Sequence, residues 1–475
     1  MLALTAMVVL AGVVAGVVTG FFAGAAERGL YASGLWTSGG ASTITPGTFD
    51  QAASPDPGST PAATPGSSDL PRPVLAPATG GRRPSPAKLA ARIRAVDDGA
   101  VGGDYSAEVA DLGSGEALFR HRAGSPSIPA STLKLLTATT VLSLLGPDHE
   151  FTTRVVRAGN GRIVLVGGGD PYLAGASSTR NPERASLAAL AASTALALKR
   201  TGTTGVRLDY DATLFSGPAW NPRWPERYAD QVTPVSALWV DEGRTAGVSP
   251  GPRVGDPAKA AARSFAAALE KLGVSVTVGK AAGAPRTAKA LARVQSMPLQ
   301  QIVETMLLAS DNDAAEVLFR QAALADGRTG SAADGARTVR AELSALGLWD
   351  TDARVVDGSG LARQNKVPAD ALVEVLRTAA AASHPELRSV ITGLPVAGVD
   401  GSLVIRFLDE RSLAGRGVVR GKTGTLTGVH ALAGYLETAD GGLVAFAFLV
   451  NDATDGYAAR VWLDRVSTAL SRCGC

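Results

Sequence analysis

Apolar and small residues fill the first positions of the chain, and this block differs from the periodic patterns that follow it. Residues 1–26 contain no charged side chain and no proline, and about 20 apolar residues are enough to cross a bilayer. The block therefore predicts a transmembrane anchor or a signal segment. A cleavable signal usually begins with basic residues, so the pattern favours an uncleaved anchor, although Ala23-Gly24-Ala25 would suit cleavage.

Hydrophobic periodicity is absent from residues 36–85. This stretch is rich in Ser, Thr, Pro, Gly and Ala and offers little apolar surface to bury. Such a composition is typical of a linker, and an extended Pro-rich chain gains about 3 Å per residue. We expect the linker to hold a folded domain on the order of 100 Å from the membrane.

The periodic part of the chain begins near residue 86. Its first elements are a short helix over 87–96, a hairpin of strands at 105–110 and 117–121, and an apolar helix over 133–145. Gly146-Pro147 ends that helix. Near the other end of the chain, three paired strands are predicted at 418–425, 431–437 and 443–450.

Residues 151–286 lie between these two parts and carry a pattern of their own. Strands are predicted at 152–157, 162–166 and 206–210, and helices near 185–199 and 257–272. The sequence thus predicts an α/β (α+β) fold, with a main domain formed by residues 86–150 plus 287–475. A large α/β region, residues 151–286, interrupts that domain.

Composition agrees with two or three folded units and excludes several classes of protein. The chain has 475 residues, of which 45% are hydrophobic. Its 46 basic and 43 acidic residues nearly balance, so no nucleic-acid partner is expected. Cys473 and Cys475 are the only cysteines, which excludes a disulfide framework and a cysteine metal cluster. We expect no metal and no cofactor.

Candidate chemistry starts at Ser131-Thr132-Leu133-Lys134, at the beginning of the apolar helix. Residues three apart are neighbours on a helix, so the lysine can reach the serine hydroxyl. If the amine is buried near another cation, its pKa falls and it can accept the serine proton. A serine at a helix start is more often only a cap, but Lys134 changes that interpretation.

Two further motifs follow in order. Ser310-Asp311-Asn312 lies at the joint between predicted helices at 297–310 and 313–324, where Asp and Asn could also serve only as caps. Lys422-Thr423-Gly424-Thr425 lies on a predicted strand, and its glycine would let a ligand approach the backbone. A lysine in a strand is more often a solvated edge residue, although its small hydroxylated neighbours are unusual for a plain edge.

The ordered motifs S-x-x-K, S-D-N and K-T-G are the signature of class A β-lactamases and penicillin-binding proteins. Residues 86–470 resemble more specifically the D-alanyl-D-alanine carboxypeptidase/endopeptidase family, that is, the low-molecular-mass class C, penicillin-binding protein 4-like enzymes of peptidase family S13. The further stretches that carry this resemblance are Gly168-Gly169-Asp170-Pro171, Pro234-Val235-Ser236-Ala237-Leu238, Asp357-Gly358-Ser359-Gly360-Leu361 and Leu394-Pro395-Val396-Ala397-Gly398-Val399-Asp400-Gly401.

The resemblance implies a β-lactamase/transpeptidase-like domain with an antiparallel sheet flanked by helices, and it implies a serine peptidase. Ser131 would attack the carbonyl between two D-alanines, Lys134 would act as base, and Ser310 and Asn312 would relay protons and hold the amide. The segment Lys422-Thr423-Gly424-Thr425 would bind the terminal carboxylate, and the backbone N–H groups of Ser131 and Thr425 would form the oxyanion hole. Arg363 is a secondary candidate for contacting the stem peptide, with a surface salt bridge as the alternative.

The implied substrates are peptidoglycan stem peptides, and β-lactam antibiotics would be covalent inhibitors. An enzyme of this kind works outside the cytoplasm, here anchored to the membrane by the N-terminal segment, or secreted if that segment is cleaved. Family members commonly have Ser where this chain has Ala362 and Asn where it has Asp241, which bears on peptide preference. A serine β-lactamase and a non-hydrolytic penicillin-binding sensor remain the alternatives.

Overall fold

The computed structural model describes residues 81–96, 99, 101, 103–159, 161–176, 183–285, 287–349 and 351–475. They belong to one compact unit, residues 78–475. The predicted anchor or signal segment at 1–26 and nearly all of the predicted linker at 36–85 lie outside the described residues. Within the described ranges, no helix combines the length and apolar character needed to span a bilayer.

A five-stranded antiparallel sheet brings the two ends of the folded chain together, because its order is β2-β1-β10-β9-β8. The N-terminal hairpin pairs with the last strand through β1 and β10, for example Ala107 with Phe448. The strand bounds are β1 Asp104–Asp111, β2 Ala117–His121, β8 Arg420–Leu426, β9 Val429–Glu437 and β10 Leu443–Asn451. β8, which carries the Lys422 motif, is an edge strand.

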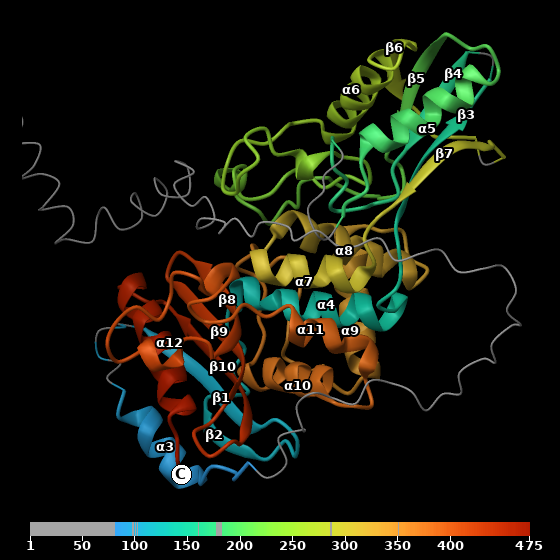
Figure 1. The fold of residues 1–475 in the computed structure, drawn as a ribbon. Coiled ribbons are helices and arrows are strands. Elements are labelled where there is room, and N and C mark those ends of the chain that lie inside the picture. The colour runs from blue at the N-terminus through green and yellow to red at the C-terminus, as the bar shows by residue number, and fades with distance from the viewer. Residues whose placement is uncertain are drawn as a thin grey trace, which may run out of the picture. The chain divides into compact units, whose positions relative to one another are not determined.

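The two faces of this sheet differ in side-chain size. On one face, large residues such as Phe446 and Phe448 pack against Trp462 of α12 (Gly456–Ser471) and Leu89 of α3 (Pro86–Arg94). On the other face, Ala445 and Ala447 of β10 and Ala431 and Ala433 of β9 pack against the helices. Figure 1 shows α3 and α12 on one side of this sheet and α10 on the other. Small residues on the second face allow the helices to approach the strands closely.

The helices on the alanine side surround α4 (Lys134–Leu145), whose residues 134–142 are all buried. Its buried positions are apolar residues and threonines, together with Lys134 at its first position. The 3₁₀ turn η1 (Ala130–Leu133) leads directly into it. Around α4 lie α7 Leu299–Ala309, α8 Asn312–Ala325, α9 Ala332–Ala345, α10 Ala369–Ala380 and α11 Arg388–Thr392.

The region between α4 and α7 forms a second five-stranded sheet, with the order β6-β5-β4-β3-β7. Its strands are mixed, since β4, β5 and β6 are parallel whereas β3 is antiparallel to both β4 and β7. The elements are β3 Thr152–Arg157, β4 Arg162–Val166, α5 Leu187–Lys199, β5 Gly205–Asp211, α6 Pro257–Glu270, β6 Ser275–Ala281 and β7 Ala290–Gln295. Helices α5 and α6 contact one another and share a core with the sheet (Figure 1).

This second sheet includes β7, which lies beyond the boundary at residue 286 that the sequence pattern suggests. The entry and exit of the region meet at Phe151 and Ser296. The Phe151 N–H donates to Ser296 Oγ at 2.9 Å, and the Ser296 N–H donates to the Phe151 carbonyl at 2.9 Å. β7 is short and mostly half-exposed, so it has no run of apolar residues by which periodicity could reveal it.

The segment that leads into β8 is fixed by a buried ion pair. Arg406 donates twice to Asp464 of α12, at 3.0 Å from Nε and 2.7 Å from Nη2, and Asp464 also accepts from the Phe407 N–H. The remaining 3₁₀ turns are η2 Glu226–Tyr228, η3 Asp241–Gly243, η4 Pro385–Leu387, η5 Gly401–Leu403 and η6 Leu413–Gly415. The pair therefore holds this segment against α12, which η6 also contacts, while η5 lies next to the edge strand.

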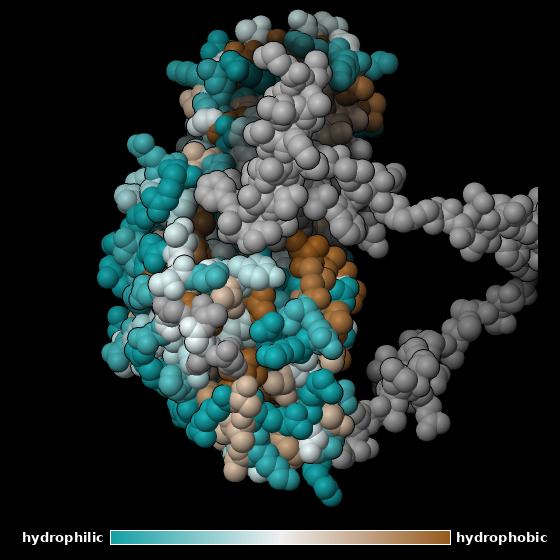
Figure 2. Space-filling view, turned by 90° about the vertical axis from the view of Figure 1, so that its left-hand side faces the viewer, coloured by the Kyte–Doolittle hydropathy of each residue, from teal (hydrophilic) through white to brown (hydrophobic). Residues whose placement is uncertain are grey.

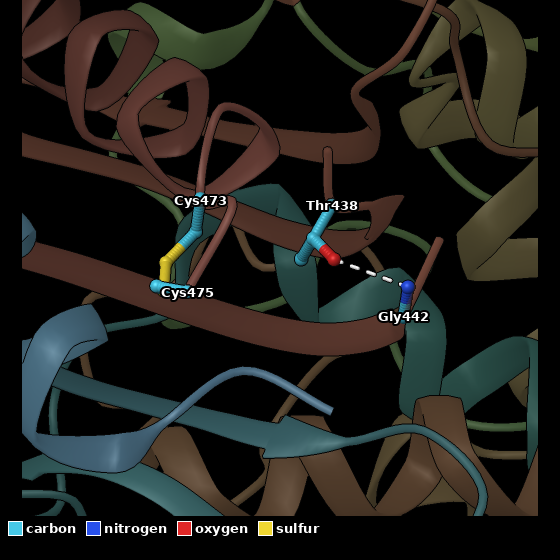
Figure 3. The surroundings of a disulfide bond; sticks show 4 residues. All are labelled: Thr438, Gly442, Cys473 and Cys475. Carbon is cyan, nitrogen blue, oxygen red and sulfur yellow. Dashed lines mark hydrogen bonds between the residues drawn. A yellow bond between two sulfur atoms is a disulfide. The ribbon is translucent and has the colours of Figure 1, made fainter. Parts of the chain in front are cut away.

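The chain ends in a disulfide between Cys473 and Cys475, two residues apart (Figure 3). The Cys475 carbonyl accepts from the Ser85 N–H at 2.8 Å, which ties the C-terminus to the start of α3. Beside it, the Gly442 N–H donates to Thr438 Oγ1 at 3.1 Å in the β9–β10 turn. This disulfide closes a very small ring and links no distant elements.

The predicted fold class, an α/β (α+β) fold with an antiparallel sheet flanked by helices, is confirmed. Polar residues cover most of the described surface on the face shown in Figure 2, and the apolar residues there form separate groups. The sequence pattern did not reveal α9, α10 and α11, which complete the layer of helices around α4.

Candidate active site

Ser131 lies in η1, between the antiparallel sheet and the helices around α4. Ala130 before it has a φ of 46°, in the left-handed region. Two glycines leave room for this backbone. A Cβ at Gly360 would come 1.9 Å from the Ala130 carbonyl oxygen, and one at Gly424 would come 2.6 Å from the Pro129 carbonyl oxygen. The nucleophile candidate is thus held between β8 and the turn that contains Gly360.

Lys134 stands one helical turn after Ser131, at the start of α4. Its Nζ lies 2.9 Å from Ser131 Oγ, 2.8 Å from Asn312 Oδ1 and 2.8 Å from the Ser359 carbonyl oxygen. Asn312 Oδ1 and the Ser359 carbonyl can only accept hydrogen bonds. A neutral amine would give its two protons to these acceptors, which leaves its lone pair for the Ser131 hydroxyl proton.

The Lys134 side chain is fully buried. Burial lowers the pKa of Lys134 to about 8, and the carboxylates of Asp311, Asp357, Glu316 and Asp313 act in the opposite direction. A desolvated ammonium loses more hydration energy than a neutral amine, which is the cause of the main shift. The neutral amine needed by a general base is therefore accessible near neutral pH.

The Ser310-Asp311-Asn312 motif forms the joint between α7 and α8. Ser310 ends α7 in a left-handed conformation, with φ 56° and ψ 38°. Asp311 caps α8 by accepting from the Ala314 N–H at 3.1 Å. Asn312 contacts Lys134 through Oδ1 and donates from Nδ2 to the Gln231 carbonyl at 3.1 Å. The two outer residues of the motif therefore reach the lysines, while the middle one caps a helix.

Two arginines of the inserted region form ion pairs with the carboxylates at this joint. Arg244 Nη2 lies 2.6 Å from Asp311 Oδ2 and 3.2 Å from Asp313 Oδ2, and Arg253 Nη2 lies 3.3 Å from Asp313 Oδ2. Asp313 also accepts from the Thr233 N–H at 2.7 Å. No local pattern predicts these pairs, because the arginines stand about 60 to 70 positions before the motif.

Lys422 extends from the edge strand β8 and is fully buried. Its Nζ donates to Ser310 Oγ and to the Thr423 carbonyl, at 2.8 and 2.9 Å. Burial lowers the pKa of Lys422 well below its usual value, and the positive charge of Lys134 adds to the effect. An anion bound beside Lys422 would restore its charge, because opposite charges favour the ionised form.

The rest of the Lys422 motif passes from buried to exposed positions along β8. Thr423 Oγ1 lies 2.8 Å from Ser402 Oγ, and the side chain of Thr425 is exposed. Ser402 belongs to η5 and was not among the residues predicted from the sequence. Its position directly after the Leu394–Gly401 stretch is the one signal that could have identified it.

Arg363 does not take part in the hydrogen bonds that join Ser131, Lys134 and Asn312 in the described part of the chain. Its Nη1 donates to the Thr427 carbonyl at 2.7 Å. It also lines a cavity of about 440 Å³. The cavity combines cationic and aromatic side chains, namely Arg223, Arg227, Arg363, Trp224 and Tyr228.

Metal ligation has no evident place in this site. In the ranges that the structure describes, no group of three or more His, Cys, Asp or Glu side chains is arranged to hold a metal ion. The groups around Ser131 are instead an amine, an amide, hydroxyls and backbone carbonyls. This set supports nucleophilic catalysis by a serine with a lysine base.

Comparisons with known proteins give one consistent result. A family model described as the D-Ala-D-Ala carboxypeptidase 3 (S13) family matches residues 87–250 and 244–470. Carboxypeptidase Rv3627c of Mycobacterium tuberculosis is 35% identical over 399 residues, which cover 82% of this chain and 85% of that protein. Carboxypeptidase DacB of Mycolicibacterium smegmatis is 34% identical over 441 residues, which cover 92% of this chain and 94% of that protein.

The fold is shared with a solved structure. Penicillin binding protein 4 (dacB) from Haemophilus influenzae matches with a TM-score of 0.65 and 21% sequence identity, over 81% of this chain and 98% of that chain. The same protein complexed with a β-lactam matches with a TM-score of 0.61. At this level of identity the match concerns the fold.

Replacing Gly360 by alanine should displace the nucleophile. Gly360 has a φ of 85°, and the new Cβ would collide with the Ala130 carbonyl. We expect labelling of Ser131 by a fluorescent penicillin to slow by about 100-fold, as for a misplacement of about 1 Å. Gly347→Ala is the matched control, because Gly347 has a φ of 72° but open space around it. Equal labelling rates in the two variants would contradict the role of the close approach.

Proposed function

Because the chain belongs to the D-Ala-D-Ala carboxypeptidase 3 (S13) family, we propose that Ser131 is the acylating nucleophile of its peptidase activity and Lys134 the base. The protein is a serine D-Ala-D-Ala carboxypeptidase. One observation carries the residue assignment: the buried Lys134 amine lies within hydrogen-bond distance of both Ser131 Oγ and Asn312 Oδ1. A second buried lysine, Lys422, contacts Ser310 Oγ at 2.8 Å, but its other hydrogen-bond partner is the Thr423 carbonyl and not an amide side chain.

Acylation begins when the Ser131 hydroxyl gives its proton to the neutral Lys134 amine. Oγ then bonds to the carbonyl carbon of the penultimate D-alanine. The backbone N–H groups of Ser131 and Thr425 are the proposed donors to the tetrahedral oxyanion. When the C–N bond breaks, the proton held on Lys134 passes to the leaving amine, with Ser310 as the proposed relay. Free D-alanine and an ester on Ser131 result.

Deacylation uses the same groups in reverse order. Lys134 takes a proton from a water molecule, whose oxygen attacks the ester carbon. The bond to Ser131 Oγ then breaks, and Oγ recovers the proton from Lys134. A β-lactam forms the same ester on Ser131, but its leaving group stays attached to the acyl part, so we propose that the adduct persists.

Lys422, Thr423 and Thr425 are proposed to bind the terminal carboxylate of the substrate. The carboxylate would stabilise the charged form of Lys422, whose ammonium is otherwise costly to bury. A charged Lys422 in turn favours the neutral form of Lys134, because two ammonium groups repel each other. Substrate binding and activation of the base are thereby coupled through one electrostatic interaction.

Arg363 and the cavity beside it are proposed to receive the acyl side of the stem peptide. The arginines can pair with carboxylates, and the rings of Trp224 and Tyr228 can pack against aliphatic parts of the peptide. We propose that crosslinked stems are also cleaved. In that case the leaving amine belongs to a second stem, while the acylation chemistry is unchanged.

We further propose an extracytoplasmic enzyme held at the membrane by residues 1–26. The apolar block, the Pro-rich stretch at 36–85 and a peptidoglycan substrate support this location. The Cys473–Cys475 disulfide suits an oxidising compartment.

The location can be tested by fractionating cells that express the full chain or a chain starting at residue 27. We expect the full chain in the membrane fraction and the shortened chain elsewhere. N-terminal sequencing of the mature protein distinguishes an anchor from a cleaved signal. Recovery of the full chain from the cytoplasm without membrane would contradict the proposal.

The nucleophile assignment predicts one covalent adduct. Mass spectrometry of the protein treated with a fluorescent penicillin should find a persistent acyl group on Ser131, and a peptide ending in D-Ala-D-Ala should release D-alanine. Both signals should vanish in Ser131→Ala and persist in Ser344→Ala, an exposed serine of α9. Rapid penicillin turnover without peptide cleavage would indicate a β-lactamase, and a stable adduct without cleavage would indicate a sensor.

Acylation should depend on pH through Lys134. The amine must be neutral to accept a proton, and its pKa is about 8. We therefore expect the acylation rate to be constant above this pKa and to fall by roughly tenfold per pH unit well below it. Stopped-flow measurements with a fluorescent penicillin would show this, with tryptophan fluorescence checking that the protein stays folded. A rate that is flat from acid to alkaline pH would be inconsistent with Lys134 as base.

A further inference from the structure

Backbone N–H groups of the turn formed by residues 357–362 donate hydrogen bonds to two buried carboxylates. The N–H groups of Gly358 and Ser359 donate to Glu316 Oε1, at 2.9 and 2.7 Å. The N–H groups of Gly360 and Ala362 donate to the Asp357 carboxylate, at 2.9 and 2.7 Å. The orientation of these peptide planes is therefore set by acceptors on one side of the turn.

The carbonyls of the same turn face α4. The Gly358 carbonyl accepts from Thr137 Oγ1 at 2.8 Å, and the Ser359 carbonyl accepts from Lys134 Nζ at 2.8 Å. The Gly358 carbonyl and the Ser359 N–H belong to the same peptide unit. Thr137 donates to its carbonyl, and its N–H donates to Glu316. Glu316 thus fixes the peptide plane directly before the carbonyl that contacts the base.

Glu316 and Asn312 act on Lys134 from one face of α8, since residues four apart on a helix are neighbours. Asn312 contacts the amine directly, and Glu316 acts through the turn. The turn lies directly on the helix, because a Cβ at Gly358 would come 2.6 Å from the Ala315 carbonyl oxygen and from Phe319 Cβ. Both acceptors for the Lys134 protons are therefore positioned by α8.

We propose that Glu316 is a positioning residue for the acylation step: it holds the Gly358–Ser359 peptide so that the Ser359 carbonyl orients the Lys134 lone pair toward Ser131. The inference rests on the proposed roles of Ser131 and Lys134. It assigns a task in the reaction to a side chain that contacts neither the substrate nor the reacting atoms.

The role depends on an acceptor oxygen and not on a negative charge. Glu316 is 1% exposed, and burial, followed by the neighbouring Asp357 carboxylate, raises its pKa. The nearby cation is Arg320, one helical turn further along α8. Its hydrogen bonds go to the carbonyls of Ser216 and Pro218. Oε1 accepts from the two backbone N–H groups whether the acid is ionised or protonated, so an amide oxygen can replace it.

The test compares Glu316→Gln, which keeps an acceptor, with Glu316→Met, which keeps the volume without one. The full chain is treated with a fluorescent penicillin, and the burst amplitude is measured separately from the acylation rate. The amplitude counts folded sites, and the rate reports how well each site reacts. We expect Glu316→Met to acylate at least about tenfold more slowly per site, and Glu316→Gln to stay within about threefold of the native rate.

Native protein in the same assay distinguishes a failure of the proposed function from a failure of the proposed role of Glu316. If native protein is not acylated at Ser131, the proposed function fails. If it is acylated and Glu316→Met reacts at the native rate per site, only the role of Glu316 is overturned. Equal losses in Glu316→Gln and Glu316→Met would also overturn it, because charge would then be the important property.

A second variant covers the case in which Glu316→Met does not fold. Thr137→Val preserves shape and removes the other hydrogen bond that fixes the turn, at the Gly358 carbonyl. In the Glu316→Gln background it should lower the acylation rate per site by severalfold while the burst amplitude stays near the native value. An unchanged rate would show that the orientation of the turn does not limit acylation.

Discussion

The structure around Ser131 follows from the need to bury the amine of Lys134 without leaving its protons unpaired. A buried ammonium or amine with a missing partner costs several kcal/mol, of order 2–7 for a neutral polar group. Three neighbours from different parts of the chain meet this need, namely Ser131, Asn312 and the Ser359 carbonyl. The positions of α4, α8 and the 357–362 turn are all constrained by this one atom.

The amine of Lys422 adds a second constraint of the same kind. Lys422 is buried as fully as Lys134, and each disfavours the charge of the other. The carboxylates on the far side, including Asp311 and Asp357, limit how far the pKa of Lys134 falls. The pKa of Lys134 thus reflects burial, which lowers it, against carboxylates that raise it.

The residues proposed to carry the chemistry could be located from the sequence because they belong to short motifs at predictable places. Ser131 and Lys134 share a helical turn, Ser310 and Asn312 flank a helix cap, and Lys422 lies on a strand. Local periodicity was sufficient to place these elements to within a few residues. The structure joins the five side chains into two hydrogen-bonded groups, Ser131 with Lys134 and Asn312, and Ser310 with Lys422.

The partners of these residues could not be predicted in the same way. Glu316, Ser402 and Arg244 are single residues whose contacts come from elements far apart in the chain. Nothing in their local pattern distinguishes them from helix, turn or surface residues. The strand β7 could not be predicted for a different reason. Its residues are all partly or fully exposed, so they show no clear alternation of apolar and polar positions.

The two arginines that the inserted region supplies to Asp311 and Asp313 have a consequence for how the chain can change. A deletion of that region would leave carboxylates buried near Lys134 without their cations, at a cost of about 3–5 kcal/mol for each broken pair. The Ser310-Asp311-Asn312 joint therefore depends on the inserted region for the cations that pair with its carboxylates. An attempt to reduce this enzyme to a minimal scaffold must first neutralise those two acids by substitution.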